Sequence, residues 1–290
     1  MKKLLVTGCN GQLGRAINEY YANQTEYELV NTDFGVEGIK SLDITNLDDV
    51  ITAMEEIRPY AVINCAAHTA VDLCEVQQDL AYKINAIGPR NLSIAASKTG
   101  AKMMHISTDY VFAGDGTKPY TEFDQTAPKA MYGITKLAGE NFVKEFAKEY
   151  YIVRTAWLYG DGKNFVKTML RLSETHDRIS VVNDQIGSPT SAKELAKAIG
   201  YLIPTDNYGL FHGTCEGQCS WADFTKEIFK LAGKKTEVAA VTTEEYMKMN
   251  PNSAKRPAYS VLENYMLKLT TEFAFADWED AIHEYMKEMV

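Results

Sequence analysis

The stretch Lys3-Leu4-Leu5-Val6-Thr7-Gly8-Cys9-Asn10-Gly11-Gln12-Leu13-Gly14 decides the fold of this chain. A short apolar run leads into glycines spaced G-x-x-G-x-x-G, and a helical stretch follows over residues 15–21. In the order strand, glycine turn, helix, backbone N–H groups can approach a pyrophosphate at the positive end of the helix. The three glycines therefore predict dinucleotide binding, although a tight turn without a ligand would also use them.

The first half of the chain alternates between strand and helix patterns. Apolar runs predict buried strands over residues 3–7, 27–31, 61–64, 102–107 and 150–155. Helices are expected between them, over residues 15–21, 47–58, 80–99 and 132–148. This alternation predicts an α/β protein with a Rossmann-type, doubly wound parallel sheet that is covered on both faces.

After Gly160 the elements become shorter and more mixed. Helices are expected near residues 164–174, 191–203, 220–233 and 276–289, and strands near 179–182, 209–213 and 237–241. The capping box Ser191-x-x-Glu194 is predicted to begin the second of these helices. We expect a dinucleotide-binding domain over 1–157, with a returning segment near 178–203. A smaller mixed α/β substrate domain is expected over 158–290.

Several polar motifs follow the ends of predicted strands, where ligands bind in open parallel sheets. They are the glycine turn, Asp33, the turn at residues 65–70, Thr108 and Trp157. Asp33 lies nineteen residues after Gly14, where a carboxylate accepts hydrogen bonds from the ribose hydroxyls and repels a 2′-phosphate. No Arg or Lys occurs at residues 34–39, so NADH is favoured over NADPH. The alternative is an aspartate in a surface loop.

Tyr132 and Lys136 are four residues apart in a predicted helix, so both lie on one face. An ammonium group ~4 Å from a phenol would favour phenolate by roughly 4 kcal/mol, or about three pKa units. The tyrosine would then titrate near pH 7, as an acid/base catalyst should. The hydroxyl of Thr108 could hold a carbonyl oxygen beside the phenol. Alternatively, a surface helix contains this pair by chance.

Composition narrows the possible partners and compartments. A net charge of −9 disfavours nucleic acid, and no apolar run approaches the ~18 residues of a membrane span. The cysteines are few and odd in number, which predicts reduced thiols in the cytoplasm. They are Cys9, Cys65, Cys74, Cys215 and Cys219. The last two form a Cys-x-x-x-Cys motif without a second ligand pair, and the histidines lack metal-ligand spacing, so no metal is expected.

The glycine turn with Thr108, Tyr132 and Lys136 resembles the extended short-chain dehydrogenase/reductase superfamily. Across essentially the whole chain, the motifs are similar to those of dTDP-4-dehydrorhamnose reductases. The matching stretches are Cys65-Ala66-Ala67-His68-Thr69-Ala70-Val71-Asp72, Ser107-Thr108-Asp109-Tyr110-Val111-Phe112, Tyr132-Gly133-x-Thr135-Lys136-Leu137, Arg154-Thr155-Ala156-Trp157 and Asn183-Asp184-Gln185-x-Gly187-x-Pro189-Thr190. The last two stretches separate these reductases from epimerases and dehydratases of the superfamily.

The resemblance implies NADH- or NADPH-dependent reduction of the C4 keto group of dTDP-4-dehydro-L-rhamnose to dTDP-L-rhamnose, a precursor of surface polysaccharide. Tyr132 would act as general acid. Lys136 would lower the tyrosine pKa and bind the nicotinamide ribose, and Thr108 would hydrogen-bond the reacting oxygen. Open alternatives are another nucleotide-sugar reductase or epimerase of this superfamily and a non-catalytic regulatory subunit with the same fold.

Further site residues follow from the resemblance. The cofactor would be lined by the glycine turn (Gly8, Gly11, Gln12, Leu13 and Gly14) and by Asp33, Asp43, Ile44, Ala67, His68, Thr69, Ile106, Tyr132 and Lys136. The sugar would contact Val71, Thr108, Asp109, Tyr110, Tyr132 and Trp157. From its own chemistry His68 is better explained as part of the turn than as a base. We add Arg256, because its fork of donors suits the substrate diphosphate and an acidic chain needs a local cation there.

The chain departs from the resemblance at one point. Some of these reductases dimerise around a divalent ion held by glutamates, one of them two residues past the third glycine. Here that position is Ala16, and the second glutamate is out of register because Glu194 is shifted by one. We therefore expect no structural metal and a monomer or weak homodimer.

Overall fold

A parallel β-sheet forms the centre of the molecule. In the computed structural model, which describes residues 1–251 and 253–289, this seven-stranded sheet has the order β11-β6-β5-β4-β1-β2-β3, and all its neighbouring strands are parallel. The strands are β1 (Lys2–Thr7), β2 (Tyr27–Asp33), β3 (Lys40–Ser41), β4 (Ala61–Asn64), β5 (Lys102–Thr108), β6 (Tyr150–Thr155) and β11 (Gly209–His212). The predicted parallel sheet is confirmed, with β11 from the second half of the chain as an edge strand.

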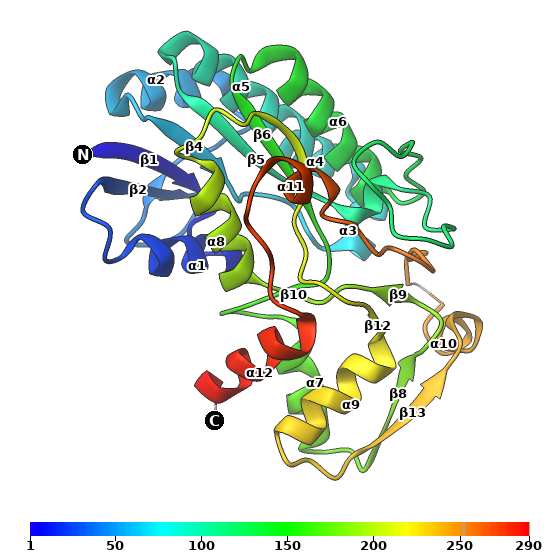
Figure 1. Cartoon of the computed structure of the whole chain (residues 1–290). Coiled ribbons are helices and arrows are strands. Elements are labelled where there is room, and N and C mark those ends of the chain that lie inside the picture. Colours follow the sequence, from blue (N-terminus) through cyan, green and yellow to red (C-terminus); the bar gives the residue numbers. More distant parts are fainter. Residues whose placement is uncertain (252, 290) are drawn as a thin grey trace.

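Helices cover both faces of this sheet (Figure 1). Helices α1 (Gln12–Tyr21) and α8 (Ala192–Leu202) pack together on one face, and α2 (Leu47–Ile57), α5 (Gly88–Thr99) and α6 (Met131–Phe146) cover the other. Successive strand residues enter different cores. Leu4 packs on the α1–α8 side and Leu5 on the opposite side, and both are fully buried. Burial on both faces explains why the strand reads as a continuous apolar run.

The helical region after β4 is more broken than predicted. Helix α3 (Val71–Val76) was not expected. The helix predicted over 80–99 consists of α4 (Gln78–Tyr82), a π-helical turn (Lys83–Ile87) and α5. The wide turn places Asn85 in the interior, where it is fully buried. Gly100 ends α5 with a φ of 74°, a conformation that glycine adopts without strain.

The second half of the chain adds small sheets and helices, most of them in the lower part of Figure 1. The paired strands are β7 (Leu158–Tyr159) with β10 (Thr190–Ser191), β8 (Arg178–Val182) with β13 (Glu237–Val241), and β9 (Ile186–Gly187) with β12 (Cys219–Ser220). The helices are α7 (Phe165–Ser173), α9 (Trp221–Leu231), α10 (Thr243–Met249), α11 (Tyr265–Thr270) and α12 (Trp278–Met289). Helices α10 and α11 were not predicted. The domain boundaries stay a prediction.

One local prediction in this half was wrong, the capping box at the start of α8. Ser191 caps α8 by accepting a hydrogen bond from the Lys193 N–H at 3.3 Å, but the Glu194 carboxylate does not complete a capping box. It accepts the Ala276 N–H at 3.2 Å instead, because the chain leading to α12 crosses there.

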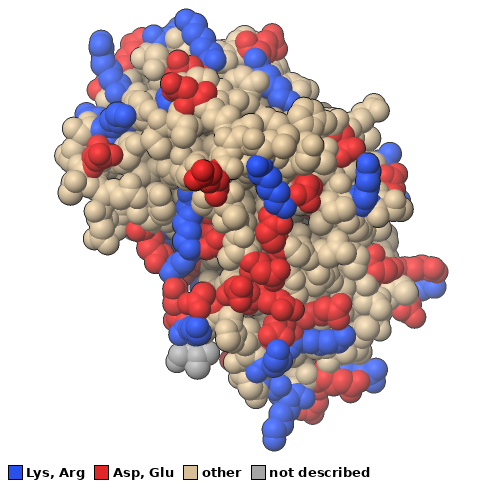
Figure 2. Space-filling model, viewed as in Figure 1, with Lys and Arg blue, Asp and Glu red and all other residues tan. Residues whose placement is uncertain are grey.

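The surface carries mixed charge. On the face shown in Figure 2, acidic side chains gather around the middle of the molecule, with basic side chains between them and no continuous basic area. Among the described residues, no helix has both the length and the apolar character needed to cross a membrane.

Candidate active site

A cavity of about 740 Å³ lies where the carboxyl ends of the central strands meet the second half of the chain. It brings together most of the residues that were singled out in the sequence. Those that line it are Gly11, Gln12, Leu13, Gly14, Ala67, Thr69, Val71, Ile106, Thr108, Asp109, Tyr110, Tyr132, Lys136 and Trp157. They come from the turns after β1 and β4, the ends of β5 and β6, and the first turns of α6.

The glycine turn is built for close approach of backbone atoms. Gly8 has a φ of 64°, and a Cβ there would lie 2.7 Å from the Ala66 nitrogen. A Cβ at Gly14 would collide with the Gly8 carbonyl oxygen. Gly11 is the N-cap of α1 and has no side chain to cover the first N–H groups. A free helix N-terminus of this kind fits the pyrophosphate of a nicotinamide dinucleotide.

Asp33 is connected to the rim of this cavity through Asn10. Its carboxylate accepts the Asn10 N–H at 3.0 Å, and Arg15 donates to the Asn10 carbonyl at 2.9 Å and to the Asn10 side-chain oxygen at 2.8 Å. Arg15 also forms an ion pair at 2.6 Å with Asp161, from the loop after β7. The glycine turn is thereby tied both to the end of β2 and to the second half of the chain.

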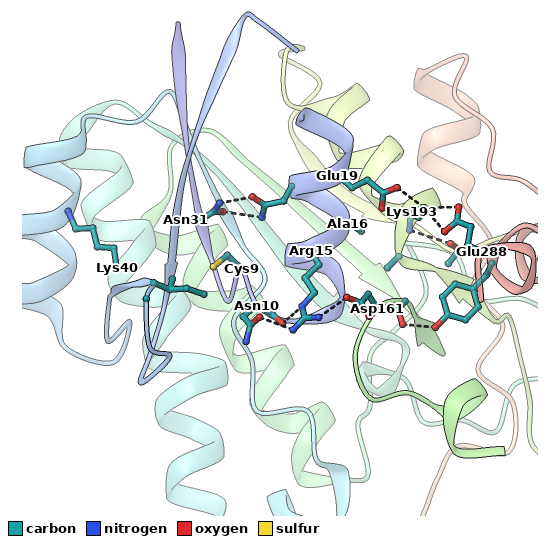
Figure 3. A pocket seen from close by; sticks show the side chains of 17 residues that line it. Cys9, Asn10, Arg15, Ala16, Glu19, Asn31, Lys40, Asp161, Lys193 and Glu288 are labelled. Carbon is teal, nitrogen blue, oxygen red and sulfur yellow. Dashed lines mark hydrogen bonds and ion pairs between the residues drawn. The ribbon is translucent and has the colours of Figure 1, made fainter. Parts of the chain in front are cut away.

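A second cavity, also of about 740 Å³, lies on the other side of Arg15 (Figure 3). Its polar groups are already matched in pairs. Lys193 contacts Glu19 at 2.6 Å and Glu288 at 2.7 Å, and Ala16 lies on the neighbouring face of α1. None of the predicted catalytic or binding residues lines this cavity. It is therefore a separate, ion-paired cleft between α1, α8 and α12.

The structure corrects the predicted pKa shift of Tyr132. Burial raises the pKa of the Tyr132 phenol, the Asp109 carboxylate raises it further, and the Thr108 hydroxyl acts in the opposite direction. Lys136 donates to the Ile106 carbonyl at 2.5 Å, and burial lowers its own pKa to about 8. The expected lowering of the tyrosine pKa fails because burial is the largest influence on this phenol, and the Lys136 ammonium donates to a backbone carbonyl instead of to the phenol. Tyr132 stays protonated at neutral pH, as a proton donor must.

Thr108 and Asp109 form a buried pair at the end of β5. The Thr108 hydroxyl donates to the Asp109 carboxylate at 2.8 Å and accepts the Tyr110 N–H at 3.2 Å. Burial raises the pKa of Asp109 to about 6, and the hydrogen bond from Thr108 acts in the opposite direction. The second carboxylate oxygen of Asp109 is buried and has no partner among the described residues. A polar atom of this kind is suited to a ligand hydroxyl.

Four residues of the predicted cofactor set, besides the turn residue Gly8, do not line the cavity. Asp33 lies beside it, as described above. Asp43 is engaged by Thr45, whose N–H and hydroxyl both donate to it. Ile44 is buried against α5, and its carbonyl accepts from Asn91. The backbone of His68 is held by Asn85, as expected for a residue that shapes the turn.

Arg256 is also outside the main cavity. It lines a smaller cavity of about 320 Å³, next to Tyr110, which both cavities share. Its guanidinium lies 3.3 Å from the carboxylate of Asp72, the residue after Val71. No motif in the sequence points to this partner, because the two residues are far apart along the chain. A diphosphate at Arg256 would compete with Asp72.

Among the residues at or near the site that were not predicted, two connect separate parts of the chain. Trp221, the first residue of α9, lines the main cavity and stacks on Trp157 at 3.5 Å between ring centroids. Asn85 in the π-helical turn bonds both backbone groups of His68 and the Thr135 hydroxyl, so it connects the 65–70 turn to α6. No motif spacing marks Trp221. A helix break near Asn85 could have been sought, since π turns are frequent at functional sites.

Comparisons with known proteins agree with this geometry. The chain is similar to a dTDP-4-dehydrorhamnose reductase of Clostridium acetobutylicum, with 54% identity, 99% of each chain covered and a TM-score of 0.94. It is also similar to the Bacillus anthracis dTDP-4-dehydrorhamnose reductase solved in complex with NADP, with 45% identity, 100% of each chain covered and a TM-score of 0.93. The spore coat polysaccharide biosynthesis protein SpsK of Bacillus subtilis is 40% identical over 99% of this chain and 98% of that protein.

A family model described as "RmlD substrate binding domain" matches residues 1–290, the full length of the chain. The match includes both the dinucleotide turn and the helices of the second half, so it covers every element that lines the main cavity. The chain belongs to the RmlD substrate binding domain family.

Proposed function

We propose that this protein is an NAD(P)H-dependent dTDP-4-dehydrorhamnose reductase, which reduces the C4 keto group of dTDP-4-dehydro-L-rhamnose to give dTDP-L-rhamnose. One observation carries the proposal. Tyr132 and Lys136 line the same cavity as the glycine turn, in a chain that belongs to the family throughout its length. A dinucleotide cradle and a protonated phenol in one cavity are what the reduction of a carbonyl requires.

The chain's own residues handle the proton. When bound, the nicotinamide supplies a hydride to the carbonyl carbon. The Tyr132 hydroxyl donates its proton to the oxygen, and its raised pKa keeps the donor form populated until that moment. The positive charge of Lys136 would stabilise the phenolate that remains, and the attraction is strengthened because the ammonium is buried. Thr108 and Asp109 orient the reacting oxygen and a neighbouring sugar hydroxyl.

The remaining site residues are proposed in two groups. The first turn of α1, with Ala67, Thr69 and Ile106, would hold the cofactor. NADH would be favoured, because Asp33 places a negative charge beside Asn10 on the ribose side. The sugar would lie against Val71, Tyr110 and Trp157, and Arg256 would meet the diphosphate after release from Asp72. These assignments place the nicotinamide between the two halves of the chain.

We also propose that the enzyme acts in the cytoplasm as a monomer or weak homodimer. All five cysteines are free thiols, which suits a reducing compartment. Ala16 supplies no carboxylate at the position where some related reductases bind a bridging ion. Glu19 and Glu288, which line the same cavity as Ala16, are both paired with Lys193. The nucleotide sugar is the only partner that this reading requires.

A coupled assay tests the function. The protein is incubated with dTDP-4-dehydro-L-rhamnose and either NADH or NADPH, and cofactor oxidation is followed together with the chromatographic appearance of dTDP-L-rhamnose. Equal amounts of product and oxidised cofactor are expected. An epimerase would change the sugar without net oxidation, and a regulatory subunit would do neither. The assignment of the substrate would be supported if other nucleotide-linked keto-sugars were all reduced more slowly than dTDP-4-dehydro-L-rhamnose.

A further inference from the structure

The cavity has an aromatic wall that the two halves of the chain build together. Trp157 follows β6, and Trp221 begins α9. Their indole rings are stacked, with centroids 3.5 Å apart and planes 7° from parallel. Both side chains line the main cavity and are only partly buried. Phe165 from α7 supports the far side of the pair, at 4.4 Å from the Trp221 ring.

The backbone of Trp157 is held in a conformation that its side chain disfavours. Its φ is 47°, in the left-handed region that residues with a Cβ rarely adopt. The surroundings maintain it. The Trp157 carbonyl accepts the Thr190 N–H at 3.2 Å, and Gly187 packs so closely that a Cβ there would collide with the indole. Strained residues held this way are frequent where a side chain must be aimed at a ligand.

We propose that Trp221 is a specificity-determining residue, which forms with Trp157 the aromatic wall against which the apolar part of the sugar ring packs. The inference rests on the proposed function and deepens it. A 4-keto-6-deoxy sugar carries a methyl group and ring C–H groups that cannot hydrogen-bond. The indole edges that line the cavity would remove these groups from water, whereas a C6 hydroxyl against the same wall would lose its hydrogen bonds. The stack also keeps Trp157 in its strained position.

The test separates the sugar from the nucleotide. Dissociation constants of dTDP-L-rhamnose and of dTDP are measured by calorimetry for the wild type and for Trp221→Leu, Trp221→Phe and Trp278→Phe. The last variant is a matched control, because Trp278 packs on Phe224 in the core and lines neither cavity. Trp221→Leu should weaken the binding of dTDP-L-rhamnose about tenfold and the binding of dTDP less than twofold. Trp221→Phe should have an intermediate effect on dTDP-L-rhamnose binding. Trp278→Phe should change neither constant.

Circular dichroism gives an independent readout of the stack. Two parallel indoles in contact produce an exciton couplet, which should be lost in both Trp221 variants and kept in Trp278→Phe. The proposal would be refuted if the Trp221 variants bound both ligands more weakly by the same factor. It would also be refuted if the couplet were lost but the affinity for dTDP-L-rhamnose were unchanged. Turnover distinguishes the two proposals. If the wild type reduces the keto-sugar but the Trp221 variants bind dTDP-L-rhamnose as tightly as the wild type, only the role of the aromatic wall is refuted. If the wild type is inactive on the keto-sugar, the proposed function is refuted.

Discussion

Arg154 donates two hydrogen bonds to the carboxylate of Glu140, at 2.8 and 2.7 Å, and both side chains are almost completely buried. Glu140 lies one helical turn after Lys136 on α6. Ser107, paired with Arg154 across β5 and β6, donates a third hydrogen bond to Glu140 at 2.6 Å. The ion pair therefore joins the helix that carries Tyr132 to the two strands whose ends form the site.

Glu140→Gln should shift the pH profile of kcat. Burial lowers the pKa of Lys136 and the Glu140 carboxylate raises it, so loss of this charge lowers the pKa below about 8. Lys136 then loses its proton at a lower pH, and the alkaline limb should move down by about one unit, the effect of a ~1.4 kcal/mol interaction. Stability should fall by about 3 kcal/mol in urea unfolding, because Arg154 keeps a buried charge without its counterion.

Lys144→Met provides the control for this change. Lys144 lies 3.7 Å from the same carboxylate but is partly exposed. Its removal should therefore leave the alkaline limb of the pH profile unchanged and change the free energy of unfolding by less than about 0.5 kcal/mol. A Glu140→Gln enzyme that is destabilised but keeps the wild-type alkaline limb would reduce Glu140 to a purely structural role.

Tyr132→Phe should lower kcat by at least ~100-fold, the usual contribution of a general acid. The ring would remain, with its edge contact to Tyr110 at 5.4 Å, so the cavity should keep its shape. Binding of NADH, measured by fluorescence titration, is expected to change less than twofold. Near-normal turnover by this variant would show that another group delivers the proton.

The sequence predicted the sheet and the cofactor edge because those features are local. A buried parallel strand is a short apolar run, and a glycine turn needs its glycines in adjacent positions. Asn46 caps α2 and Gly100 ends α5 through chemistry that is equally local. The polar residues after each strand were predicted to lie at one edge because the sheet was expected to be parallel. All neighbouring strands of the sheet are indeed parallel.

The missed features depend on contacts between distant parts of the chain. Trp221 enters the cavity because α9 packs beside the turn after β6, and Asp72 meets Arg256 through the fold alone. The pKa of Tyr132 was predicted in the wrong direction for a related reason. The spacing of Tyr132 and Lys136 shows that an ammonium is near, but the depth of burial depends on residues from both halves of the chain.

Asp33→Ala should narrow the preference between NADH and NADPH. The substitution removes the negative charge beside the ribose and frees the Asn10 N–H, while Arg15 stays bound to the Asn10 carbonyl. We expect the kcat/KM ratio of the two cofactors to shift toward NADPH by about tenfold, through loss of the charge repulsion. Asp48→Ala, which removes an exposed carboxylate on α2, should leave the ratio unchanged. If both variants keep the wild-type ratio, Asp33 does not contact the ribose.

Asp109→Asn should stabilise the protein at neutral pH while impairing turnover. Burial raises the pKa of Asp109 to about 6, against about 3.9 in an unfolded chain. Its contribution to stability is therefore complete below about pH 4 and is lost as the pH rises through 6, with a loss of about 3 kcal/mol at pH 7. The neutral amide avoids this loss. Urea unfolding at pH 4.5 and 7 should give a larger difference for the wild type than for Asp109→Asn. Equal differences would mean that Asp109 ionises in the folded protein as easily as in water.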